Sequence, residues 1–424
     1  MILSYRILTT LLYPFFLIII FLRKFLNKED KNRYKEKILS SHFNISRKKN
    51  TKLIWFHAAS LGELKSIIPI VNKLDNSKNL EFLITTVTLS SGNLAKEKFE
   101  KSENIHHRYL PIDVGFLIDD FLTKWQPYAI FLVDSEIWPN LILKAKSKNI
   151  LLGLLNARIT SKTFNRWIKV PGTAKKIFSL FNLSLTSNIE TKDFLEKLGA
   201  KNVFFKGNIK LVSQIDKAEI KNPNHEILLK KRFWFAASLH KGEDTYCLKA
   251  HIILKKKYPD LITIIAPRHI QRVNNIKNLS IKYNLSTQVL NRNELIDKDK
   301  EILILNSFGI LNNYFKYSKS VFIGKSTLKK FKNNGGQNPI EAALLGCKIY
   351  HGPYVYNFKE IYKFLEKNYI SVEVNNLNEL TDNLINDFEN LTNQEDKTVN
   401  LLNFGQKTLA DTMEKINNFL FNEI

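Results

Sequence analysis

The chain has 424 residues, of which 44% are hydrophobic and 12% aromatic. This length and apolar content exclude wholesale disorder and a disulfide-bonded miniprotein, and they predict two large domains or a few smaller ones. The 64 Lys and Arg residues outnumber the 40 Asp and Glu residues, which leaves a net charge of +24. Such a surface calls for an anionic partner, which is nucleic acid, an acidic lipid leaflet or a phosphorylated substrate.

The start of the chain favours attachment to a membrane. The stretch from Ile7 to Leu22 is almost wholly apolar, and basic residues follow it at once. The positive-inside rule then places the rest of the protein on the cytoplasmic face. Because only Arg6 precedes the apolar stretch and no small-residue cleavage site follows it, we interpret it as an anchor rather than a cleaved signal peptide. We expect a single anchor helix within residues 1–25, which either spans the bilayer or lies in its interface.

The two cysteines predict neither a disulfide framework nor a zinc site. Cys247 and Cys347 are separated by 100 positions, and no His–Cys cluster with metal-ligand spacing accompanies them. Both have apolar neighbours, so we expect small buried core residues in a reducing compartment. We expect no metal and no cofactor.

After the anchor, short apolar runs alternate with longer amphipathic stretches, which is typical of βα units in parallel sheets. The pattern continues to about residue 207, is interrupted by the polar stretch 213–224, and restarts at residue 233. We therefore predict an α/β fold with two doubly wound domains, at 26–210 and 211–400, followed by a helical stretch at 401–424. The predicted strands are Leu53–His57, Phe82–Thr86, Tyr128–Val133, Ile150–Asn156, Leu183–Thr186, Phe233–Ala237, Ile262–Ala266, Ile302–Leu305, Ser320–Ile323 and Lys348–His351.

Ligands of open parallel sheets bind beyond the carboxyl ends of the strands, and two such ends in the first half carry carboxylates. Ser60 and Glu63 have the spacing of a capping box, in which both side chains satisfy free amides of a helix start. Alternatively, Glu63 is a general base that takes a proton from an acceptor hydroxyl. Glu136 lies in a turn with Asp134, Trp138 and a proline, where it is either a cap or a functional carboxylate.

Two strand ends in the second half carry groups suited to anions. Arg268 and His269 follow a predicted strand, and they form either a phosphate or carboxylate clamp or a solvated basic turn. Further on, a diglycine precedes Asn338 as N-cap, Pro339 at the first helical position and Glu341 at the third. The free amides of such a helix start favour negative charge.

Eight segments, in this order along the chain, resemble the Kdo transferase family. These enzymes transfer 3-deoxy-D-manno-octulosonic acid (Kdo) from CMP-Kdo to the lipid A precursor of Gram-negative bacteria. The resemblance extends from the N-terminal anchor to about Phe358. The segments are Phe56–Glu63, Ser135–Asn140, Asn156–Arg158, Gly207–Lys210, Ala236–Glu243, Pro267–His269, Gly335–Glu341 and Gly352–Pro353.

The resemblance implies a GT-B fold, with two Rossmann-like domains that bind the acceptor and the sugar nucleotide, and a final helix that crosses back to the first domain. It implies inverting transfer of Kdo to lipid IVA in lipopolysaccharide biosynthesis, with Glu63 as base and with Glu136 and Lys210 stabilising the transition state. The implied donor residues are Pro267, Arg268, His269, Phe308, Gly309, Ile310, Gly336, Asn338 and Glu341. The implied acceptor residues are Ser60, Gly62, Thr88 and Arg158.

Three alternatives stay open. Asn306 and Ile310 stand where the family usually has acids, which allows a different sugar nucleotide as donor. A nucleic-acid-binding protein requires a basic stripe with interleaved aromatics, which the sequence lacks. The third alternative is a catalytically inactive relative of the family that only binds the lipid A precursor. The expected partners are CMP-Kdo, lipid IVA and anionic inner-membrane lipid, without nucleic acid or an obligate protein partner, and the expected location is the cytoplasmic face of the inner membrane.

Overall fold

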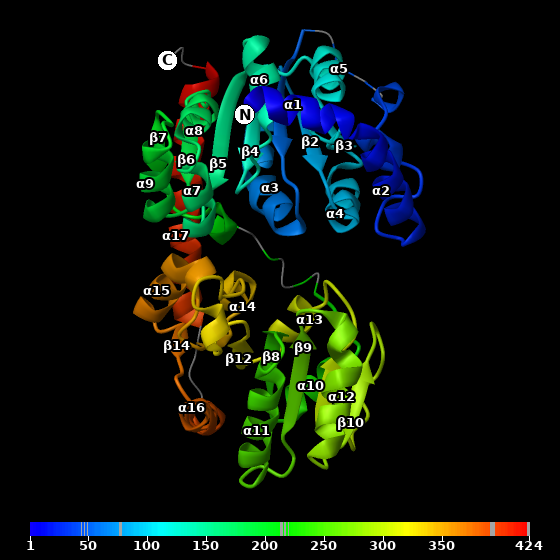
Figure 1. Ribbon diagram of the computed structural model, residues 1–424. Coiled ribbons are helices and arrows are strands. Elements are labelled where there is room, and N and C mark those ends of the chain that lie inside the picture. The colour runs from blue at the N-terminus through cyan, green and yellow to red at the C-terminus, as the bar shows by residue number, and fades with distance from the viewer. Residues whose placement is uncertain are drawn as a thin grey trace. The chain divides into compact units, whose positions relative to one another are not determined.

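The computed structural model describes residues 1–43, 45, 47–48, 50–75, 79–212, 215, 218, 220–390 and 395–421, with the backbone alone at 395–397. The chain forms two compact units (Figure 1). The first comprises Met1–Ser213 with Gly405–Ile424, and the second comprises Gln214–Phe404. The units therefore divide after residues 213 and 404, whereas the sequence predicts divisions after 210 and 400. One helix, α17 (Glu395–Phe421), contributes residues to both units.

The first unit contains a seven-stranded parallel sheet with the strand order β3-β2-β1-β4-β5-β6-β7. Its strands are β1 (Lys52–His57), β2 (Leu80–Thr86), β3 (Ile105–Tyr109), β4 (Ala129–Val133), β5 (Leu151–Ala157), β6 (Leu183–Thr186) and β7 (Val203–Phe205). Its helices after residue 30 are η1 (Tyr34–Lys37), η2 (Ser40–His42), α3 (Leu61–Asp75), α4 (Leu89–Phe99), α5 (Gly115–Trp125), α6 (Pro139–Ser147), α7 (Ser161–Trp167), α8 (Pro171–Phe178), α9 (Ile189–Lys197) and η3 (Ile209–Val212).

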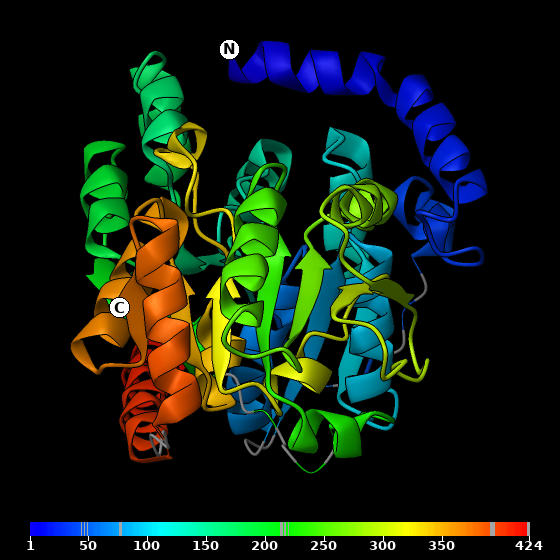
Figure 2. The ribbon, with the colours of Figure 1, turned by 90° about the horizontal axis from the view of Figure 1, so that it is seen from below.

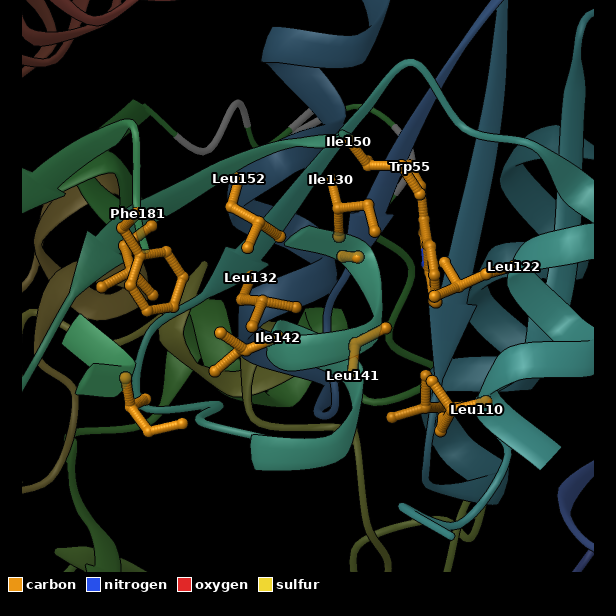
Figure 3. Close-up of a cluster of buried hydrophobic side chains, with 14 of the residues drawn as sticks. Trp55, Leu110, Leu122, Ile130, Leu132, Leu141, Ile142, Ile150, Leu152 and Phe181 are labelled. Atoms are coloured by element: carbon orange, nitrogen blue, oxygen red, sulfur yellow. The ribbon is translucent and has the colours of Figure 1, made fainter. Parts of the chain in front are cut away.

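Helices cover both faces of this sheet, so its central strands are apolar on both sides. On one face α5, α6, α8 and α9 pack against the strands, and Figure 3 shows Trp55 and Leu132 of the sheet beside Leu122 of α5 and Leu141 of α6. On the other face lie α3, α4 and the end of α17. The final helix thus buries Ile416 and Phe419 in the core of the first unit.

The expected single anchor helix is wrong, because two helices occupy this stretch. Helix α1 (Ile2–Leu11) and helix α2 (Tyr13–Phe25) meet at a bend of 56°, which Figure 2 shows in blue. The cause is Pro14, which lacks the N–H that a continuous helix would use and instead fits the first turn of α2. Among the described residues, neither helix alone has the length and apolarity of a membrane span, although the bent pair together does.

The second unit contains another seven-stranded parallel sheet, with the order β10-β11-β9-β8-β12-β13-β14. Its strands are β8 (Phe233–Leu239), β9 (Ile262–Pro267), β10 (Thr287–Leu290), β11 (Ile302–Leu305), β12 (Ser320–Ile323), β13 (Lys348–His351) and β14 (Ser371–Glu373). Its other elements are α10 (His225–Lys230), α11 (Glu243–Lys255), η4 (Ile270–Arg272), α12 (Val273–Lys282), α13 (Asn312–Phe315), η5 (Lys329–Phe331), α14 (Ile340–Leu344), η6 (Tyr356–Phe358), α15 (Lys359–Lys367) and α16 (Leu377–Glu389).

All ten predicted strands are present, each within two residues of its predicted ends. The prediction of two doubly wound α/β sheets is therefore confirmed. The structure adds β3, β7, β10 and β14, which are the edge strands of the two sheets. Both cysteines are fully buried and free, as expected.

Candidate active site

The loop after β1 holds Glu63 in the first turn of α3. The Oε2 atom of Glu63 accepts a hydrogen bond from the backbone amide of Ala59 at 2.8 Å, and Oε1 accepts one from Ser60 Oγ at 2.8 Å. Ser60 Oγ also accepts a bond of 3.4 Å from the Glu63 amide, so one half of the predicted capping box is present, whereas the Glu63 carboxylate binds the amide of Ala59 in place of that of Ser60. Glu63 is only half-buried, and a side chain built at the neighbouring Gly62 would meet nothing within 4 Å. The capping role thus leaves Glu63 only partly buried, next to the exposed Gly62.

The surroundings of Glu63 make its carboxylate more basic. Burial raises the pKa of Glu63 above its usual value, and the nearby Asp134 carboxylate raises it further. Glu136 acts in the same direction, whereas the Ser60 hydrogen bond and the Lys210 ammonium oppose the shift. The structure therefore brings together Glu63, Glu136 and Lys210, the three side chains to which the sequence assigned catalytic roles.

Asp134 connects three strand ends within this cluster. It follows β4 directly in a left-handed conformation with φ 58°, which Asp and Asn tolerate better than most residues. Its carboxylate is paired with the Lys210 ammonium and accepts a hydrogen bond of 2.6 Å from Asn156 Nδ2. Asn156, itself at φ 55°, accepts a 3.0 Å bond from the Ile209 amide. Asn156 thereby fixes the segment that carries Lys210 against β5.

Glu136 is hydrogen-bonded to Trp138 and lies close to His57. Its Oε2 atom accepts a hydrogen bond of 2.9 Å from the indole Nε1 of Trp138 and lies 3.6 Å from Nε2 of His57. His57 is fully buried at the end of β1, where its Nδ1 lies 2.9 Å from Thr85 Oγ1. The indole thus orients the carboxylate, which explains a Trp at this turn.

The predicted acceptor residues occupy three neighbouring loops. Ser60 and Gly62 flank Glu63 as described, while Thr88 follows β2 and caps α4 by accepting a hydrogen bond from Ser91 N at 3.2 Å. The amide of Thr88 also donates to Ala59 O at 3.4 Å. Arg158 follows β5, and its amide donates to Asp134 O at 3.2 Å. All four therefore lie at the same sheet edge as Glu63.

In the second unit, a basic cluster forms where β9, β8 and β12 end. Arg268 and His269 are exposed, and the His269 ring lies 5.6 Å from the ring of His240. Burial lowers the pKa of His240 to about 4; the Glu243 carboxylate opposes this shift, and the charges of Lys325, His269 and Arg268 add to it. His240 is therefore neutral near pH 7 among cationic neighbours, and it is a residue to which the sequence gave no role.

The Glu243 carboxylate accepts hydrogen bonds from the backbone of the loops that carry this basic cluster. It is fully buried at the start of α11, and its carboxylate accepts hydrogen bonds from the amides of His240 at 3.0 Å, Lys325 at 2.6 Å and Ser326 at 2.8 Å. Thr327 adds a hydroxyl bond of 3.0 Å. The turn after β8 and the loop after β12 are thus tied to one charged group.

The other predicted donor residues differ in exposure. Pro267 ends β9, Phe308 and Gly309 lie exposed in the loop after β11, and Ile310 is buried. Gly336 has φ 87°, and a side chain there would come within 3.0 Å of the backbone of Val355.

The helix start at Asn338 lies one residue later than predicted. Pro339 is the N-cap of α14, and Asn338, which is exposed, accepts a hydrogen bond of 3.1 Å from the Ile340 amide. Glu341 is therefore the second residue of the helix and not the third. The side chain of Asn338 still satisfies one of the first free amides.

Comparisons with known proteins identify the family. The family profile described as 3-deoxy-D-manno-octulosonic-acid transferase (kdotransferase) matches residues 32–213. A 3-deoxy-D-manno-octulosonic acid transferase from Haemophilus influenzae is 30% identical over 373 residues, which cover 84% of this chain and 83% of the relative. One from Rickettsia bellii is 30% identical over 426 residues, which cover 98% and 99%.

The fold is likewise shared with solved structures. A glycosyltransferase from Rickettsia africae matches with a TM-score of 0.59 at 15% identity, over 88% of this chain and 100% of that one. The family and the fold class expected from the sequence are both confirmed. The chain therefore belongs to the 3-deoxy-D-manno-octulosonic acid (Kdo) transferase family and is a glycosyltransferase with the GT-B fold.

Proposed function

We propose that this glycosyltransferase transfers Kdo from CMP-Kdo to lipid IVA in lipopolysaccharide biosynthesis, by a single displacement with inversion. The observation that carries the proposal is the half-buried Glu63, whose carboxylate has its pKa raised by burial and by neighbouring carboxylates. A base works best when its pKa approaches the operating pH. Membership of the Kdo transferase family supports the choice of sugar.

The displacement involves one bond made and one broken at the anomeric carbon of Kdo. The acceptor hydroxyl oxygen attacks this carbon while its proton passes to Glu63. The bond from the carbon to the phosphate oxygen breaks on the opposite face, and CMP leaves with the electron pair. Attack opposite to the leaving group inverts the configuration.

Lys210 and Glu136 would act around the reacting centre. The ammonium of Lys210 offsets negative charge, and its pairing with Asp134 fixes its position. Glu136, oriented by the Trp138 indole, would favour the positive charge that develops on the sugar ring as CMP departs.

The donor would bind to the second unit through its phosphate. Arg268 offers a planar fork for bidentate bonds to phosphate oxygens, and Lys325 adds charge from the neighbouring loop. The neutral His240 imidazole can donate or accept one hydrogen bond without adding a charge. Gly309, which is exposed and at positive φ, lets the backbone approach a ligand closely.

We also propose that the enzyme works on the cytoplasmic face of the inner membrane. The net charge of +24 would be attracted to anionic lipid, and a lipid acceptor is reached only at a membrane surface. The apolar helices α1 and α2 supply the attachment.

A donor screen tests the proposal. Full-length protein in detergent, supplied with lipid IVA, should release CMP from CMP-Kdo and should release no UDP from UDP-N-acetylglucosamine or UDP-glucose. The Asn306 and Ile310 segment would then be compatible with the CMP-sugar. Transfer from a UDP-sugar without transfer from CMP-Kdo would refute the assignment of the donor.

A further inference from the structure

Helices α1 and α2 expose an apolar face. Leu3, Leu8, Leu11, Phe15, Ile18 and Phe25 are all exposed although they are large hydrophobic side chains. A contiguous apolar surface of this kind marks an interaction site rather than an ordinary protein surface.

The opposite face of the same helices is docked on the first unit by apolar side chains, among them Phe16 and Ile20, and by hydrogen bonds. Tyr5 Oη donates a hydrogen bond of 2.9 Å to Asp113, and Tyr13 Oη donates one of 2.6 Å to Ile38 O. Asn140 Nδ2 donates to Thr9 Oγ1 at 3.2 Å. In an ordinary surface helix the apolar stripe faces the protein and the polar face meets water. Here apolar side chains lie on both faces, one packed on the first unit and one exposed, as expected for a helix between protein and lipid.

Asp113, the residue that binds Tyr5, is itself fixed by further hydrogen bonds within the first unit. Asp113 is 7% exposed, and its carboxylate also accepts hydrogen bonds of 2.9 Å from the amides of Asn140 and Leu141 in the first turn of α6. Removing Tyr5 from this position would leave a buried carboxylate with one partner fewer. Helix α1 is therefore fixed to the loop after β3 and to the helix that follows the Glu136 turn.

The end of α2 is fixed in the same way. Glu29, which is 3% exposed, pairs with Arg23 at 2.6 Å and with the buried Lys37. Lys37 Nζ in turn donates a hydrogen bond of 2.7 Å to Val87 O in the loop after β2. Because the strands are parallel, the loops that follow β2, β3 and β4 lie at one edge of the sheet, and that edge also carries Glu63.

Helix length and the docking contacts of α1 together bear on whether the helices cross a bilayer or lie in its plane. The 10 residues of α1 span about 15 Å and the 13 residues of α2 about 20 Å at 1.5 Å per residue, against a hydrocarbon core of about 30 Å. Neither helix alone would cross, but the pair with its 56° bend still reaches about 30 Å from end to end, so length does not exclude a crossing. The docking contacts do oppose it, because a crossing would pull Tyr5 away from Asp113 and Thr9 away from Asn140.

We propose that α1 and α2 lie together in the plane of an anionic lipid leaflet, with their outer face in the acyl boundary and the N-terminus on the same side as both units. The exposed Arg23, Lys28 and Lys31 at the end of α2 complement the lipid headgroups. This inference rests on the proposed membrane location. It adds that α1 and α2, which are packed on the first unit, hold the Glu63 edge of the sheet at the lipid surface, whereas a flexible linker to a membrane span would not fix this edge.

Labelling from each side of the membrane tests the topology. The full chain would carry a short Gly-Ser extension with one cysteine at its N-terminus, and a second variant, Lys28→Cys, would mark the cytoplasmic side. Both natural cysteines are fully buried, so the unmodified chain provides a low background. We expect an impermeant maleimide to label both positions in inverted inner-membrane vesicles and neither in spheroplasts. Labelling of the extension from the periplasmic side would overturn the proposal, as would recovery of the protein away from the membrane.

Vesicle binding tests the apolar face directly. Leu3→Ser with Leu11→Ser removes leucines that are 67% and 72% exposed, and Leu295→Ser with Leu229→Ser removes a matched pair, 67% and 71% exposed, in the second unit. On vesicles of phosphatidylethanolamine and phosphatidylglycerol, we expect the first pair to weaken binding about tenfold or more and the second pair to leave it unchanged. Equal losses would contradict the assigned surface. Neither readout requires transfer activity, so these results stand apart from the fate of the proposed reaction.

Discussion

Replacement of Glu63 by Gln separates a catalytic base from a helix cap. The amide side chain has nearly the same shape, so its oxygen can accept from the Ala59 amide while its nitrogen donates to Ser60 Oγ. Since the cap is retained, we expect the free energy of unfolding to change by less than about 1 kcal/mol. The amide cannot take a proton from an acceptor hydroxyl, so the transfer rate should fall by about 10²–10⁴-fold, which is about 3–5 kcal/mol in the barrier.

The assay pairs single-turnover transfer with urea unfolding of the same preparations. Glu63→Ala should lose the transfer rate and also about 1–3 kcal/mol of stability, because both capping hydrogen bonds disappear. Glu97→Gln, at an exposed position on α4, is the matched control and should change neither quantity. A near-normal rate for Glu63→Gln would reduce this residue to a cap. Equal losses of rate and stability in Glu63→Gln would also contradict a role as base.

Several other changes give results of defined direction. Asp134→Asn removes a carboxylate that raises the pKa of Glu63, and it frees the Lys210 ammonium, which lowers that pKa. Both effects should shift the acid limb of the pH–rate profile to lower pH. A shift to higher pH would contradict the electrostatic coupling of Asp134 to Glu63. Because Glu63 must be ionised and its pKa lies above the usual 4.5, the acid limb of the unmodified enzyme should lie above pH 4.5, which a pH–rate series measures. Arg268→Met should raise the KM for CMP-Kdo about tenfold or more and leave lipid IVA saturation unchanged, while an unchanged KM would place the phosphate elsewhere. Glu243→Ala should lower the free energy of unfolding by about 3 kcal/mol in urea titration, because several buried donors lose their acceptor; a change under 1 kcal/mol would contradict its structural role.

The sequence predicts the interior of both sheets but not their edges. Interior strands such as Ala129–Val133 are buried on both faces and therefore read as continuous apolar runs. The edge strand Ile105–Tyr109 is polar at three successive positions, and Val203–Phe205 has only three residues with two of them exposed. Polar or very short edge strands are a common protection against aggregation, and they carry little apolar signal.

At the site, the sequence indicates which strand ends matter but not which side chains pair. Asp134 was visible as a second carboxylate beside Glu136, yet its pairing with Lys210, which lies 76 positions away, depends on the fold. Asn156 was visible only as part of a motif, because its function as a bridge requires a left-handed backbone at an irregularity in β5. His240 gave no separate signal, since its neutrality results from burial and from charges on two other loops.

The most direct test of the account is the mass of the lipid product. Full-length protein is incubated with CMP-Kdo and lipid IVA, and the lipid fraction is analysed by mass spectrometry. The account predicts lipid IVA carrying one or more Kdo residues, with one CMP released for each, and no such product from Glu63→Gln. Unmodified lipid IVA after incubation with folded, CMP-Kdo-binding protein would contradict it.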